Sequence, residues 1–179
     1  MTRNRDAYTF ADTIIDVVHR HTHDGMVFHT SGKVTGMVDT DVDNFLVKAN
    51  GGAPHFQRFR ITAGRGDIDV QVYEDVVVSA DGSALASNNT NRFSSNSAVM
   101  TLHSGPTITD DGTLIHTTWL PPTSTGVGQT ASGLVGETNG EEWILHASKQ
   151  YLVRLINNSG ATIAYAYEML WYEIGYPTL

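Results

Sequence analysis

Apolar residues recur at two different spacings along this chain, and the spacing changes near Gly25. Between residues 9 and 23 the spacing is helical, with Thr9 placed to cap the first turn and Gly25 to stop the last. The apolar stripe of this predicted amphipathic helix consists of Phe10, Ile14, Val17 and Val18. Beyond Gly25 the apolar positions alternate with polar ones, which is typical of strands that bury one face.

The alternating pattern predicts strands at residues 55–61, 67–74, 99–103, 113–119, 143–146, 151–156 and 161–173. Two longer polar stretches, residues 79–97 and 121–140, are predicted to be extended loops. In the last strand, one face consists of Ile163, Tyr165, Tyr167, Met169 and Trp171. Many short strands with frequent turns predict an all-β chain, an antiparallel β-sandwich over residues 26–179 that follows an arm and helix over residues 1–25.

The composition excludes several classes of protein. The 179 residues include no Cys, which rules out disulfide scaffolds, thiolate zinc sites and cysteine nucleophiles. The formal net charge of −8 disfavours nucleic-acid binding, which needs a basic surface. We expect no membrane segment, because the longest apolar-leaning run, near residues 161–171, is interrupted by Glu168 and is too short to span a bilayer.

The charge is divided unevenly along the chain. Residues 1–65 hold eight Lys and Arg against seven Asp and Glu, a balance of +1. Residues 66–179 hold three against twelve, a balance of −9. We therefore expect a near-neutral N-terminal arm on an acidic body.

The densest group of candidate metal ligands is His19, His21 and His23. On a strand, this spacing would place three imidazoles on one face, as zinc or copper requires, and it resembles half of a cupin signature. On a helix, only His19 and His23 pair, at positions i and i+4. The helical pattern favours the second interpretation, so we predict no bound metal or other cofactor; a metal-dependent cupin with metal at His21 and His23 is the alternative.

No combination of residues in the sequence demands catalysis, and we predict that the protein is not an enzyme. A glycosidase needs two carboxylates that face each other across a cleft. The acidic pairs of this chain lie instead at strand ends and turns; they are Asp67/Asp69, Glu74/Asp75, Asp110/Asp111 and Glu141/Glu142. A carbohydrate-active enzyme and a sugar-binding aromatic face remain alternatives, the latter built from Trp119, Trp143, Tyr165, Tyr167, Trp171 and Tyr172.

Several short stretches between Ile68 and Ile174 resemble a known family. They are VQVYEDVVVSADG, NNTNRFSSN, LHSGPTITDDGTLI and YLVRLINNSGATIAYAYEMLWYEI. Within them the shared pieces are Tyr73-Glu74, Asn91-Arg92, Gly105-Pro106-Thr107, Asp110-Asp111-Gly112-Thr113, Tyr151-Leu152-Val153-Arg154, Asn158-Ser159-Gly160-Ala161 and Trp171-Tyr172-Glu173. In this order they resemble the head decoration, or cement, proteins of tailed bacteriophages.

The resemblance implies a jelly-roll-type sandwich that assembles as a homodimer or homotrimer and binds the major capsid protein. The expected location is the capsid surface of the virion, after assembly in the host cytoplasm, and the expected role is stabilisation of the shell without catalysis. We expect the stripe of Phe10, Ile14, Val17 and Val18 to contribute an interface. The alternative is a glycan- or receptor-binding domain of a phage fibre or tail.

Overall fold

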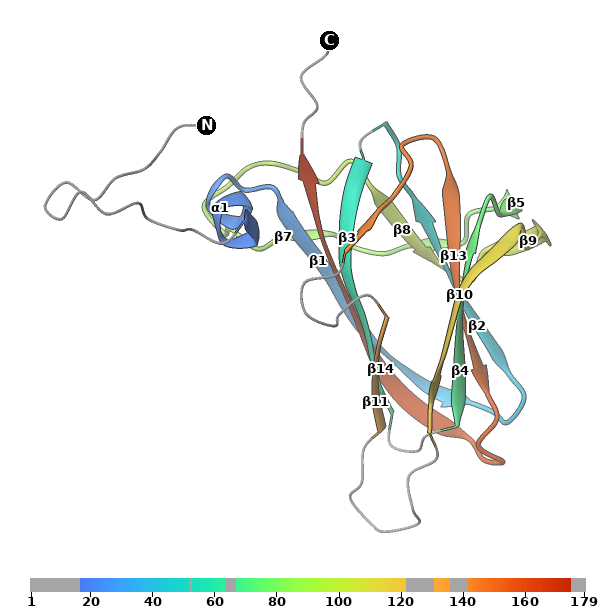
Figure 1. The fold of residues 1–179 in the computed structure, drawn as a ribbon. Helices are drawn as coiled ribbons and strands as arrows, with labels where there is room; N and C mark the ends of the chain where they lie inside the picture. The colour runs from blue at the N-terminus through green and yellow to red at the C-terminus, as the bar shows by residue number, and fades with distance from the viewer. Residues whose placement is uncertain (1–16, 52, 64–66, 122–130, 136–141, 175–179) are drawn as a thin grey trace, which may run out of the picture.

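The computed structural model describes residues 17–51, 53–63, 67–121, 131–135 and 142–174. They form the helix α1 (Val17–His23) and a series of strands (Figure 1). The strands are β1 (Val27–Met37), β2 (Val42–Lys48), β3 (Ala53–Ala63), β4 (Ile68–Glu74), β5 (Val77–Ala80), β6 (Ser83–Ala84), β7 (Asn88–Asn89), β8 (Thr101–Ser104), β9 (Thr107–Asp110), β10 (Thr113–Leu120), β11 (Ala131–Val135), β12 (Trp143–Ile144), β13 (Gln150–Asn157) and β14 (Ile163–Ile174).

Two antiparallel sheets pack face to face (Figure 1). The first, called the β1 sheet here, has the order β11-β3-β14-β1-β7, with β12 paired to β3; the second, the β2 sheet, has the order β10-β4-β13-β2-β8-β6.

 The eight main strands are β1, β2, β3, β4, β10, β11, β13 and β14. Numbered one to eight along the chain, they lie in the order 6-3-8-1 in the β1 sheet and 5-4-7-2 in the β2 sheet. This is the strand order of a jelly roll, so the predicted fold class is confirmed.

The core lies between the two sheets and is rich in aromatic side chains. The predicted face of β14 is buried there, and Trp171 at its end is fully enclosed, with its ring 6.0 Å from that of Phe28. Further down, Phe45 of the β2 sheet lies 4.8 Å from Tyr167 and 5.9 Å from Phe59, both of the β1 sheet. Aromatic pairs at these separations add to the stabilisation from apolar burial.

A second, smaller core lies on the outer face of the β2 sheet, where the two-stranded sheet β5–β9 covers part of it. Leu46 and Leu152 are buried there with Val76, and Val78 and Ile108 pack against them. This cover explains why alternation does not predict β2, since Phe45, Leu46 and Val47 are consecutive and all buried. The predicted loops 79–97 and 121–140 are likewise corrected in part, because they contain the short strands β6, β7 and β11.

The helix α1 corresponds to the end of the predicted helix; residues 9–16 lie outside the described residues. It stops at Gly25, as expected, where the backbone turns left-handed with φ of +69°. A Cβ on Gly25 would lie 2.2 Å from Ser94 Oγ, so this position also requires a residue without a side chain. Within the described ranges, no helix has the length and apolar character needed to cross a membrane.

Candidate functional site

The three histidines considered as metal ligands lie on or at the end of α1, and the helix separates them. The Nε2 atoms of His19 and His23 are 3.0 Å apart. His21 turns to the sandwich instead, with its ring stacked 4.9 Å from that of Tyr172. The strand geometry with three imidazoles on one face is therefore not the one adopted. In the part of the chain that the structure describes, no group of three or more His, Asp or Glu side chains is placed to hold a metal ion.

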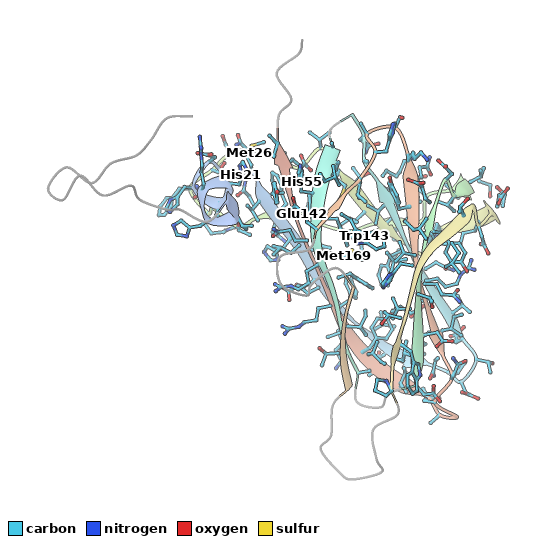
Figure 2. All side chains as sticks on the ribbon, in the orientation of Figure 1. His21, Met26, His55, Glu142, Trp143 and Met169 are labelled. Carbon is cyan, nitrogen blue, oxygen red and sulfur yellow. The ribbon has the colours of Figure 1, made fainter. Side chains whose placement is uncertain are left out.

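Four side chains from separate segments meet where α1 contacts the β1 sheet, and we call them the Tyr172 cluster: His21, His55, Glu142 and Tyr172. Figure 2 labels the first three of them. The Tyr172 ring stacks on both imidazoles, at 4.9 Å from His21 and 4.5 Å from His55. The Tyr172 hydroxyl donates a 2.7 Å hydrogen bond to Glu142 Oε2. The other oxygen, Oε1, is 2.8 Å from His55 Nδ1.

Glu142 is the charged centre of the Tyr172 cluster. Burial raises the pKa of its carboxyl, but the hydrogen bonds from Tyr172 and His55 outweigh burial and hold the pKa below its usual range. Both carboxylate oxygens are thus engaged by groups of β3 and β14. The cluster holds α1 and the segment before β12 against the outer face of the β1 sheet. Sequence alone does not reveal this arrangement, because the four residues are far apart along the chain.

A second set of contacts with the end of α1 comes from residues 89–97, which we call the asparagine loop. Asn91 Nδ2 donates to His23 O at 3.0 Å, and Asn89 Nδ2 donates to Gly25 O at 2.8 Å. Asn96 Nδ2 donates to Gly25 O at 3.2 Å and to Asp24 O at 3.3 Å. The loop therefore satisfies carbonyl groups that the end of a helix leaves without intrahelical partners.

The short stretches that resemble decoration proteins contribute residues that meet around Arg154. Its Nη1 donates to Asp111 Oδ2 at 2.8 Å, its Nη2 donates to Asp111 Oδ1, and its Nε donates to Asn44 Oδ1 at 3.1 Å. The guanidinium carbon also lies 5.0 Å from the centre of the Tyr73 ring. The hydrogen bonds from Arg154 lower the pKa of Asp111. These contacts hold the turn after β9 against the outer face of the β2 sheet.

The other acidic pairs of the described chain also bind groups of the protein itself. Glu74 and Asp75 share Lys149, at 3.1 and 2.8 Å. Asp69 accepts a 3.0 Å hydrogen bond from Asn158, and Asp110 accepts one of 2.9 Å from the backbone of Gly112. Glu141 lies outside the described residues. The contacts assign these carboxylates to turns and strand ends, as the sequence suggests.

The aromatic residues considered as a sugar platform divide into three groups. Tyr165, Tyr167 and Trp171 are buried in the core, and Tyr172 is buried beneath α1. Trp143 is half-buried, with its ring 5.3 Å from that of His116. Trp119 alone among these residues is exposed, at 52%, so they do not form one aromatic surface.

Trp119 lies at one end of a line of register neighbours across the β2 sheet, in which Asp69 separates it from the apolar residues Ile156 and Val42. Strand register places Val42 beside Ile156, Ile156 beside Asp69, and Asp69 beside Trp119. We call Val42, Ile156 and Trp119 the Trp119 row. The indole Nε1 donates to Asp67 Oδ1 at 2.9 Å, so the polar atom of Trp119 is satisfied within the chain while its ring remains half exposed.

The predicted interface on the N-terminal helix is only partly described. Phe10 and Ile14 lie outside the described residues, Val17 begins α1, and Val18 is half-buried. No protein-family model matches the sequence, and no curated protein matches it. The relation to decoration proteins therefore stays a prediction from the quoted stretches.

Proposed function

We propose that this chain is an accessory protein of a bacteriophage head. In this proposal it binds the outer surface of the major capsid shell as a homodimer or homotrimer and stabilises the shell. The family-like pieces support it because their residues contact one another: Arg154 with Asp111 and Tyr73, and Tyr151 with Glu74 at 3.0 Å. Residues that pack together in this way specify a shared framework better than isolated matches do.

The Trp119 row is the observation that carries the proposal. A half-exposed Trp whose N–H is already bonded leaves an apolar ring for a partner to cover. Trp is also among the residues that most often dominate the energy of protein interfaces. We assign the Trp119 row to the contact between copies of this chain.

The mechanism follows from repetition. Each contact with the shell is small, and small interfaces are individually weak. A dimer or trimer brings two or three such contacts to neighbouring shell subunits, so the second contact forms at high effective concentration. The oligomer would then resist separation of those subunits without any chemical step.

Quantitative mass spectrometry of purified virions tests the proposed function. The copy number of this chain is measured against that of the major capsid protein. A count in the hundreds supports a head protein. A count near three to eighteen would favour the fibre alternative, and absence from the virion would refute both.

The contact between copies has its own test, light scattering coupled to size-exclusion chromatography. We expect the wild type to elute as a dimer or trimer and Trp119→Ala to shift towards monomer. Val77→Ala is the control, because Val77 is 53% exposed on β5, outside the Trp119 row. A monomeric wild type, or an unchanged Trp119→Ala oligomer, would contradict the assignment.

A further inference from the structure

Phe93 is the most exposed large apolar side chain among the residues that the structure describes, at 102% of its reference surface. The next is Ile144, at 59%. Phe93 lies in the asparagine loop, which Figure 1 shows beside α1. A fully exposed Phe adds nothing to the core, and large aromatic side chains are frequent anchors at protein interfaces.

The asparagine loop holds Phe93 in a defined position. The backbone N–H of Phe93 donates to Asn91 Oδ1 at 3.1 Å, while Asn91 Nδ2 binds His23 O at the end of α1. The backbone N–H of Ser94 donates to Asn91 O at 3.0 Å. Asn89, which is buried, accepts a 2.9 Å hydrogen bond from the Asn91 backbone. The backbone that carries Phe93 is therefore ordered before binding, so binding has to order only the side chain.

The surroundings of Phe93 differ in charge from the whole chain. The charged side chains of residues 17–26 and 89–97 are Arg20, Asp24 and Arg92. Arg20 lies 3.8 Å from Asp24, so Arg92 supplies the net positive charge of these segments. The whole chain carries −8. Arg92 is exposed next to Phe93. This end of the described molecule is therefore suited to a protein surface that combines an apolar pocket with a nearby carboxylate.

We propose that Phe93 anchors the protein to the shell by entering an apolar pocket on the outer surface of the major capsid protein, with Arg92 facing a carboxylate at the rim. This inference rests on the proposed function, and it assigns the capsid contact to the α1 end of the sandwich. The Trp119 row is then left for contact between copies. Exposed acidic residues elsewhere in the described chain, such as Asp75 and Asp110, then face solvent, where they limit adhesion to other acidic particles.

Binding of the purified full chain to heads that lack it tests the inference, with per-copy affinity measured at low occupancy. We expect Phe93→Ala to bind roughly 30-fold more weakly, the loss typical of an interface hot spot. Phe93→Leu, which keeps an apolar side chain, should recover part of the loss. Val77→Ala is the matched control, since Val77 is exposed but lies on β5. Removing an exposed side chain leaves the fold intact, which circular dichroism checks.

The outcomes separate the inference from the proposed function. Loss with Phe93→Ala, partial recovery with Phe93→Leu and no change with Val77→Ala support the inference. If the wild type binds and Phe93→Ala stays within threefold of it, the inference is overturned while the proposed function stands. If the wild type does not bind the heads, both are refuted.

Discussion

Replacing Glu173 should strongly destabilise the fold, because this carboxylate joins β14 to the segment that leads into β8. Glu173 is only 6% exposed. Its oxygens accept hydrogen bonds from Val99 N at 2.8 Å, Met100 N at 2.9 Å and Trp171 Nε1 at 3.0 Å. The substitution Glu173→Ala leaves all three donors without this acceptor.

The magnitude follows from the burial of these donors. Two of the bonds, from Met100 and Trp171, are buried, and the one from Val99 is partly buried. Each buried donor left unsatisfied costs about 1–3 kcal/mol, so we expect Glu173→Ala to lose about 4 kcal/mol of unfolding free energy. At about 2–4 °C per kcal/mol for a chain of this size, Tm should fall by roughly 8–16 °C. Glu173→Gln keeps one acceptor oxygen and should lose about half as much.

Urea unfolding, followed by tryptophan fluorescence and far-UV circular dichroism, measures these losses. The control is Glu168→Gln, which removes a more exposed ion pair in which Arg58 lies 3.3 Å from Glu168. Such pairs contribute about 0–1 kcal/mol. A loss below about 1 kcal/mol for Glu173→Ala, or one no larger than the control's, would refute the reasoning, because water would then be replacing the carboxylate at all three donors.

Three further substitutions test other contacts. Asp111→Asn should lower the unfolding free energy by about 1 kcal/mol at neutral pH, a figure already reduced for the exposure of the pair. Because Arg154 lowers the pKa of Asp111 from 3.8, the wild type should be more stable than the variant above that pH, and the difference should vanish as the pH falls through the lower pKa of the folded state. A stability difference that stays constant in acid would contradict this. Tyr172→Phe removes a hydrogen bond to Glu142, so it should lower the unfolding free energy measured in urea by about 1–2 kcal/mol. It should also raise the pKa of Glu142, which NMR of the carboxyl group measures, and an unchanged pKa would contradict this. Gly25→Ala should loosen α1 through its positive φ, with faster amide exchange there than in β14; equal exchange would argue against this.

Alternation of apolar and polar residues predicts the strands that have one solvent-exposed face and one buried face. In β4, Ile68, Val70 and Val72 alternate with polar residues and are all buried, so the pattern and the structure agree. In β1 the pattern is concealed, because two of its inward positions are Thr30 and Gly32. Alternation of apolar and polar types is the signal, and neither residue type provides it.

The candidate surfaces were less accessible to prediction. Contacts across the fold, such as that between His21 and Tyr172, depend on how α1 is placed on a sheet. Composition also says nothing about exposure: Trp119 and Trp171 are the same residue type, yet one is half exposed and the other enclosed. The polar character of the asparagine loop correctly suggests an irregular segment, but not that Phe93 would be directed to solvent.

The contacts of Arg154 bear on how relatives of this protein should be sought. The guanidinium holds Asp111 and Asn44 and covers Tyr73, so the quoted strings around these positions are constrained by architecture. The side chain of Phe93 is fully exposed, and that of Trp119 is half exposed and bonded to Asp67 through its Nε1 alone, so the fold constrains these two positions less. Two related chains can therefore share the residues around Arg154 and still bind different partners. A search for chains with the same partner should compare the exposed positions before the residues that hold the fold together.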